Sequence, residues 1–301
     1  MEDPKPFLEE AIRTFVRSSP LNRLTSFDNE PIFEEPLLGY ADGDDPIFVE
    51  FRKVIREDHL LPREALAARL AEAGSSATTT PSVSVVAFVL PIAEATRQSN
   101  VKETQGPSLR WNHTRWQGQA FIDALERHIV STVEAQGAWA VAPDLTKAFT
   151  IQRLPGVLAS NWSHRHMAYA AGLGTFSLSD GFITPRGMAM RCGSVVTSLK
   201  MAPSSRPYAH HLANCRHYAT GKCGVCITRC PGGAISEAGH DRMKCLDILF
   251  NDQKPWIEGA HGPGYMGQYA GCGLCQTGVP CESRIPAVSK TARPGEKEGY
   301  L

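Results

Sequence analysis

The sequence predicts an α+β protein in which a core of mixed helices and strands precedes a cysteine-rich, metal-binding region. Helical hydrophobic spacing and short valine-rich runs occur in the first two thirds of the chain. Eight of the nine cysteines lie in the last third, between Cys215 and Cys281. With 301 residues, 42% of them hydrophobic, the chain is long enough to bury a substantial core.

Residues 1–78 are expected to form an N-terminal helical region. In its first helix Leu8, Ile12 and Val16 share one apolar face. The second helix is expected from about Pro62, which suits a first-turn position, to Ala73, with a glycine following as a stop signal. A low-complexity segment then leads to the core.

Residues 79–203 are predicted to form the α+β core. The apolar run from Val83 to Leu90 suits a buried strand, and 121–134 has the spacing of a helix. Further strands are expected over 138–142 and 193–199. The prolines after this last strand mark the boundary to an iron-sulfur domain over 204–288, and 289–301 is expected to be a polar extension.

The cysteine spacing predicts two four-cysteine iron-sulfur clusters. Cys230 precedes a proline, as in the bacterial ferredoxin signature, where this cysteine ligates the other cluster. That rule groups Cys230 with Cys245, Cys272 and Cys275, and leaves Cys223, Cys226 and Cys281 for the other cluster. The usual spacing would place the remaining ligand at Thr220, so Cys215 is the nearest substitute.

Zinc and disulfides are the alternatives. Zinc also accepts such cysteine pairs with help from His210, His211 or His217, although one tetrahedral site does not need eight thiols. The N-terminus is acidic and does not resemble a secretory signal, so we expect a reducing, cytoplasmic compartment rather than disulfides. Acidic and basic residues balance at 31 each, and no apolar run approaches the roughly 20 residues of a membrane span. Neither a membrane nor a nucleic acid is therefore an expected partner.

The segment from Asn161 to Gly187 resembles the cobalamin-dependent epoxyqueuosine reductases and reductive dehalogenases. The matching positions are Ala171-Gly-Leu-Gly174, Ile183-Thr-Pro185, Gly187 and Gly193, followed by the cysteines in the same order. The resemblance covers about residues 80 to 286 and implies a nitroreductase-like, cobalamin-binding core followed by a bacterial ferredoxin-like domain with two 4Fe-4S clusters.

The resemblance further implies that an external ferredoxin or flavodoxin supplies electrons through the clusters to a base-off cobalamin. The reductive reaction would act on a small organic or nucleoside-like substrate. The residues implied at the corrinoid are Gly172, Leu173, Gly174, Thr184, Arg186 and Gly187. The Asp-x-His-x-x-Gly motif for a lower axial histidine is absent, which agrees with these families and equally with a protein that has no corrinoid. On the residues alone, the glycines also suit a plain helix end.

The catalytic candidates are His164, Arg165 and Tyr169. Epoxyqueuosine reductases carry an aspartate, thought to be the proton donor, before this helix, whereas 159–163 contains no acid and Asp144 is a poor positional substitute. Reductive dehalogenases pair a tyrosine with a basic residue, which Tyr169 with Arg165 or Arg186 would imitate. Histidine titrates where a neutral-pH proton donor is useful, but a structural role is equally open.

Two further features leave alternatives open. The polar-aromatic stretch 110–116 is expected either to line the substrate side or to form a packed loop. Cys192 is expected to be a small buried apolar residue or a free thiol near cobalt. The second functional hypothesis is a ferredoxin-like electron-transfer protein that keeps the fold without a corrinoid.

Overall fold

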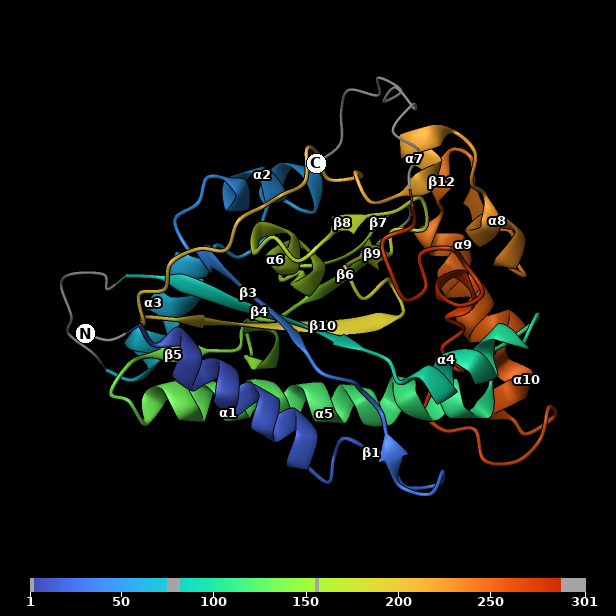
Figure 1. The fold of residues 1–301 in the computed structure, drawn as a ribbon, viewed down its shortest axis with the longest axis horizontal. Helices are drawn as coiled ribbons and strands as arrows, with labels where there is room; N and C mark the ends of the chain where they lie inside the picture. Colours follow the sequence, from blue (N-terminus) through green and yellow to red (C-terminus); the bar gives the residue numbers. More distant parts are fainter. Residues whose placement is uncertain (1–2, 75–81, 155–156, 288–301) are drawn as a thin grey trace.

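A four-stranded antiparallel sheet forms the centre of the molecule in the computed structural model, which describes residues 3–74, 82–154 and 157–287 (Figure 1). The strand order is β3 (Leu37–Asp42), β4 (Ser84–Pro91), β10 (Met190–Thr197) and β5 (Ala140–Val141). The β4 and β10 strands pair along their full length, from Pro91 opposite Met190 to Ser84 opposite Thr197. All residues of β4 are buried, because helices cover both faces of the sheet.

Helices cover the two faces of the sheet (Figure 1). On one face α1 (Lys5–Ser18) packs with α5 (Leu109–Glu134), and Phe88 and Phe121 belong to the core between these helices and the sheet. On the other face lie α2 (Ile47–Val54), α3 (Pro62–Glu72) and α6 (His164–Ala170). Alternate β4 side chains therefore enter different cores, Val86 on the α5 side and Val85 on the α6 side.

Short elements complete the core region. They are β1 (Arg23–Leu24), β2 (Glu30–Pro31), α4 (Glu94–Val101), η1 (Pro143–Leu145), β6 (Ile151–Leu154), β7 (Val157–Ser160), β8 (Thr175–Phe176) and β9 (Phe182–Ile183). The strands among them pair as β1 with β2, β6 with β7 and β8 with β9, outside the central sheet. Each of these strands has two or four residues.

The cysteine-rich region lies at one end of the core, at the right of Figure 1. Its elements are α7 (Arg216–Thr220), α8 (Val225–Arg229), β11 (Ile235–Ser236), β12 (Gly239–His240), α9 (Arg242–Asp247), η2 (Ile248–Asp252), α10 (Lys254–Ile257) and η3 (Leu274–Gln276). Loops with many left-handed glycines join these elements, including Gly273 immediately before η3. Among the helices of the described ranges, none combines the length and the apolar character needed to cross a membrane.

The predicted helices α1 and α3 and the predicted strands β4, β5 and β10 are present. The helix predicted from residue 121 begins at Leu109, so the stretch 110–116 belongs to α5 and not to a loop. Ser108 explains the earlier start, because its side chain accepts the Trp111 N–H and caps the helix. The description of 1–78 as helical was incomplete, since β3 from this region pairs with β4 in the central sheet.

Candidate functional site

Four cysteines line one small cavity in the C-terminal region. This first cysteine group consists of Cys215, Cys223, Cys226 and Cys281. The other lining residues include Met188 and Val279, which make much of the wall apolar. Cys215 precedes α7 and takes the place next to Cys223 that the usual ferredoxin spacing would assign to residue 220. The Thr220 hydroxyl donates a hydrogen bond to the main-chain oxygen of Arg216 within α7.

The remaining four cysteines of the region form the second cysteine group, Cys230, Cys245, Cys272 and Cys275. Burial raises the pKa of the Cys275 thiol well above its usual range, and its neighbours Cys272, Cys245 and Cys230 raise it further. Burial and the nearby Cys272 and Cys230 likewise raise the pKa of Cys245 to about 11. Cys226 of the first group also acts on Cys275, so the two groups are close neighbours.

Several neighbouring thiols with raised pKa values lose their protons at neutral pH only when a bound cation compensates the negative charges of the thiolates. In the first group, burial followed by the nearby cysteines raises the pKa of Cys226 to about 11 and that of Cys281 to about 12. Without a metal these thiols therefore keep their protons at neutral pH. The donor set fits a cationic metal centre that replaces the protons.

The separation of the sulfurs can be compared with that around a single zinc ion. Tetrahedral Zn–S bonds of about 2.3 Å place two sulfurs about 3.8 Å apart. Within the described part of the chain, no three cysteine sulfurs lie within 4.8 Å of one another. In this structure the sulfurs of the described cysteines are therefore not gathered as closely as a single tetrahedral zinc ion requires.

The glycines expected at a corrinoid pack against protein backbone instead. A Cβ on Gly172, which has a φ of 76°, would lie 2.1 Å from the Ser205 carbonyl oxygen. A Cβ on Gly174 would lie 2.4 Å from the Ile183 oxygen. These close approaches explain both glycines without a cofactor.

The other corrinoid candidates are also engaged with protein groups. Thr184 Oγ1 donates to the Gly187 oxygen at 2.9 Å, and Arg186 forms an ion pair with Glu34. The Leu173 side chain lies beside Gly39 of the central sheet. The described contacts of these residues therefore do not fit a macrocycle lying on them, and the cobalamin contact stays a prediction.

The catalytic candidates on α6 point to different partners. Arg165 donates to the main-chain oxygen of Asp180, and the Tyr169 ring packs 5.9 Å from the Phe176 ring. Arg186 is occupied by its ion pair with Glu34. The structure therefore gives Tyr169 and the two arginines separate environments and does not assemble the tyrosine–base pair suggested by the resemblance.

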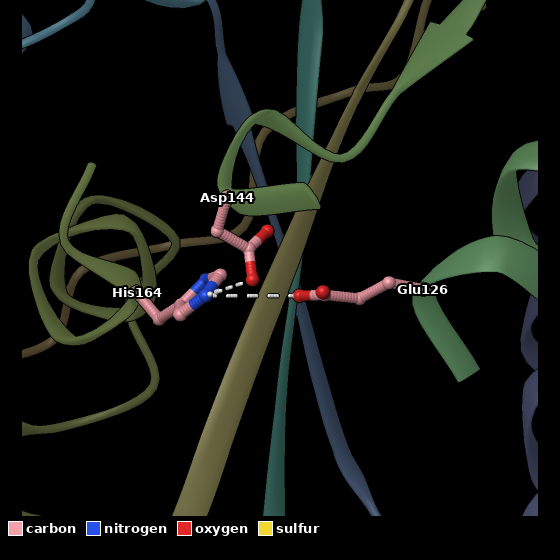
Figure 2. A group of neighbouring side chains, drawn as sticks. All are labelled: Glu126, Asp144 and His164. Carbon is pink, nitrogen blue, oxygen red and sulfur yellow. Dashed lines mark ion pairs between the residues drawn. The ribbon is translucent and has the colours of Figure 1, made fainter. Parts of the chain in front are cut away.

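His164 does join a chemical constellation, with Glu126 and Asp144 (Figure 2). Its Nε2 lies 3.1 Å from Asp144 Oδ2 and 3.8 Å from Glu126 Oε1. Its Nδ1 lies 2.9 Å from the hydroxyl of Ser194 on β10. The Glu126 side chain is 0% exposed, that of Asp144 9% and that of His164 20%, so the triad is buried but keeps one edge accessible.

The two carboxyl groups of this triad titrate in opposite directions. Burial, reinforced by the nearby charge of Asp144, raises the pKa of Glu126 well above its usual range. Burial also acts upward on Asp144, but the hydrogen bond and charge of His164 outweigh it and hold the pKa of Asp144 below its usual value. The metal-free triad therefore holds a protonated Glu126 beside an ionised Asp144.

Sequence reasoning missed Glu126 and undervalued Asp144. Glu126 follows Leu125 on the buried face of α5, four residues after Ile122 and three before Ile129. An acid inside an apolar stripe is the signal that identifies it, since such a group is rarely buried without a partner. Asp144 follows β5 closely, and only the packing of α6 against the sheet brings it to His164.

The comparisons with known proteins agree with this fold. The sequence matches no family model and no curated protein. The structure of the catabolic reductive dehalogenase NpRdhA with 3-bromo-4-hydroxybenzoic acid is similar at a TM-score of 0.51 and 13% identity. The match covers 93% of this chain and 37% of that one, so this chain spans little more than a third of the dehalogenase.

Two epoxyqueuosine reductase structures are also similar. One is selenomethionine-labelled, with a TM-score of 0.46 and 14% identity over 97% of this chain and 69% of that one. The enzyme from Bacillus subtilis gives a TM-score of 0.45 and 14% identity over 97% and 68% of the two chains. The chain thus shares the fold of the reductive dehalogenase, which confirms the predicted resemblance at the level of the fold.

Proposed function

We propose that this protein is an oxidoreductase that carries electrons through two 4Fe-4S clusters to a reductive reaction. The main support is the gathering of the first cysteine group around a single cavity. The second group adds four mutually close thiols beside it. Such clusters accept and release single electrons at potentials set by burial, charge and hydrogen bonds.

In this proposal the first cysteine group holds one cluster and the second group holds the other. Apolar side chains such as Met188 and Val279 keep water away from the first cluster. The Ala234 N–H, which lies 3.2 Å from Cys230 Sγ, donates a hydrogen bond to a ligand sulfur of the second. Both features tune a cluster potential. An external ferredoxin or flavodoxin would supply the electrons in the cytoplasm, and a small molecule would accept them.

Base-off cobalamin is the electron acceptor that the fold suggests. When bound, it would supply the reductive chemistry itself. The close packing at Gly172 and Gly174 accounts for both glycines without a corrinoid, and their contact with one stays a prediction. The second candidate is an electron-transfer protein that shares the fold and carries clusters without a corrinoid, and the packing of these glycines is compatible with it.

Metal analysis of protein purified without oxygen, from cells supplied with cobalamin, tests the proposal. Two clusters predict about eight irons and about eight acid-labile sulfides per chain. A single zinc without sulfide would overturn the cluster assignment. One cobalt per chain supports the corrinoid enzyme, whereas full clusters without cobalt support the electron-transfer protein.

Cys192 offers the matched control for this experiment. It lies on β10 opposite Val89, outside both cysteine groups. Cys192 is partly buried, and the loss of solvation raises the pKa of its thiol to about 11, so it stays protonated at neutral pH. Cys192→Ser should therefore retain the full iron content, while Cys226→Ser should lose about half of it.

A further inference from the structure

The triad of Glu126, Asp144 and His164 lies outside both cysteine groups and plays no part in electron transfer as proposed above. Its members come from three separate elements, α5, η1 and α6. Their side chains point toward a common centre (Figure 2). Among the described residues, only these three form a group of three or more histidine, cysteine or acidic side chains whose ligand atoms all lie within 4.8 Å of one another.

The distances within the triad suit ligands of one small cation. Metal–ligand bonds of about 2.1 Å place neighbouring ligand atoms about 3.0 Å apart in an octahedral site and about 3.4 Å apart in a tetrahedral one. His164 Nε2 lies 3.1 Å from Asp144 Oδ2 and 3.8 Å from Glu126 Oε1. These two distances lie within a few tenths of an ångström of the tetrahedral value, and all three ligand atoms lie within 4.8 Å of one another.

The hydrogen bonds around the triad orient it as a metal site requires. The Ser194 hydroxyl lies 2.9 Å from His164 Nδ1 and also accepts the Trp162 Nε1–H at 3.0 Å. With Nδ1–H donating to Ser194, the lone pair of Nε2 faces the two carboxylates, as in histidines that bind metals. The Ser194 main-chain N–H donates to Glu126 Oε1 at 3.0 Å and holds that carboxyl in place.

Two buried oxygens in the triad lack a hydrogen-bond partner among the described residues when both carboxyls are ionised, because a hydrogen bond between Glu126 and Asp144 needs a proton that the two groups share. The two oxygens are Glu126 Oε2 and Asp144 Oδ1. An unpaired buried carboxylate oxygen is costly, and the Glu126 side chain is 0% exposed. A bound cation would compensate both carboxylates at once, whereas the metal-free site must keep a proton on Glu126.

We propose that Glu126, Asp144 and His164 bind one divalent transition-metal ion of the Mn²⁺, Fe²⁺ or Zn²⁺ class. One imidazole with two carboxylates is a mixed ligand set of the kind that these ions accept. Three protein ligands leave coordination positions open, and the accessible edge of His164 provides a route for the ion or a water molecule. The site shares no residue with the two cysteine groups.

Manganese separates this site from the cluster iron. Cluster-loaded protein is first treated with EDTA, and its iron and sulfide are measured to show that the clusters remain. Mn²⁺ is then titrated while the EPR signal of the free ion is recorded. We expect one Mn²⁺ to bind per chain, with a rise in Tm on binding.

The sharpest variant is Glu126→Gln. Glutamine has nearly the same shape as the protonated acid of the metal-free site, so the fold should be kept while the anionic ligand is lost. We expect at least about 100-fold weaker Mn²⁺ binding, and about 10-fold to 100-fold weaker binding for Ser194→Ala, which removes the support of His164. Asp144→Asn provides a second ligand variant if Glu126→Gln does not fold.

Asp123→Asn is the matched control. Asp123 lies three residues before Glu126 on the same helix, and its replacement by asparagine also removes one carboxylate. Its side chain accepts a hydrogen bond from Gln119 and is not part of the triad. Asp123 acts on Glu126 only through its charge, so the Mn²⁺ affinity of this variant should fall far less than that of Glu126→Gln. No binding by the wild type, or wild-type affinity in both ligand variants, would show that the triad is only a proton-sharing cluster. Either result would leave the iron and sulfide counts, and hence the proposed function, unaffected.

Discussion

The guanidinium of Arg229 donates to the main-chain oxygen of Asn100 at 3.2 Å, joining the cysteine-rich region to the end of α4 in the core. The same side chain donates to the Glu103 oxygen at 2.9 Å and to the Thr277 oxygen at 3.0 Å. Arg229 directly precedes Cys230, and Thr277 follows η3, which contains Cys275. One side chain therefore ties two segments that carry cysteines of the second group to the core.

Arg229→Met should weaken this connection. The variant leaves several carbonyl oxygens without their charged donor, and each lost bond of this kind costs roughly 1.5–3 kcal/mol. We expect a lower Tm and preferential loss of iron from the second cysteine group, measured by calorimetry and iron analysis. Lys222→Met removes an exposed cation from the same region and should behave like the wild type. Equal stability of the two variants would contradict the role assigned to Arg229.

Cys230→Ala tests the division of the cysteines into groups. Cys230 is close in sequence to Cys226, but it acts electrostatically on Cys245 and Cys272. The variant should therefore lose the cluster of the second group and keep that of the first, with about half of the iron remaining. EPR spectra of the reduced protein check which cluster survives, with Cys223→Ala as the reciprocal variant. Loss of the first cluster in Cys230→Ala would reverse the assignment.

The sequence predicted local features well because they depend on neighbouring residues. The apolar stripe of α1 and the valine-rich run of β4 are both where the pattern placed them. The grouping of Cys215 with Cys281 was also accessible, because ferredoxin spacing limits the possible partners. The strand β3 was missed because its pairing with β4 joins segments more than 40 residues apart.

The triad shows the same limit more clearly. Asp144 and His164 are 20 residues apart, and Glu126 lies on a third element. Their meeting depends on how α5 and α6 pack on opposite faces of the sheet, which no local pattern specifies. Similarly, a glycine next to a helix end suggests an open approach for a cofactor, whereas at Gly174 the space is filled by the Ile183 carbonyl.

Gly174→Ala should therefore act on stability rather than on a cofactor. Its Cβ would lie 2.4 Å from the Ile183 oxygen, a main-chain atom that cannot move without its strand. Overpacking of this kind costs about 1–3 kcal/mol, and the loss should appear in denaturation of protein prepared without cobalamin. In the control Gly224→Ala the nearest contact is an ordinary 3.4 Å. Unchanged stability of Gly174→Ala would mean that the glycine is kept for another reason, such as a ligand.

We expect the buried imidazole of His59 to make the protein less stable in mild acid. The residue is 0% exposed, its ring stacks on Trp162, and its Nε2 accepts the Ser163 N–H at 3.2 Å. Burial lowers the pKa of His59 from 6.5 to about 4. The folded protein thus keeps a neutral imidazole at pH values where the unfolded chain binds a proton.

The sign follows from this difference in proton binding. Stability from His59 is complete above pH 6.5 and declines as the pH falls through 6.5 toward about 4, where the folded form also protonates. Between pH 7.5 and pH 5 the loss amounts to about 2 kcal/mol. His59→Gln removes the titration while keeping an acceptor for Ser163, so urea unfolding of this variant should lose about 2 kcal/mol less than the wild type over that range. His210→Gln, at an exposed position, should match the wild type. If His59→Gln follows the wild-type dependence on pH instead, the pKa of the buried imidazole is not lowered in the folded protein.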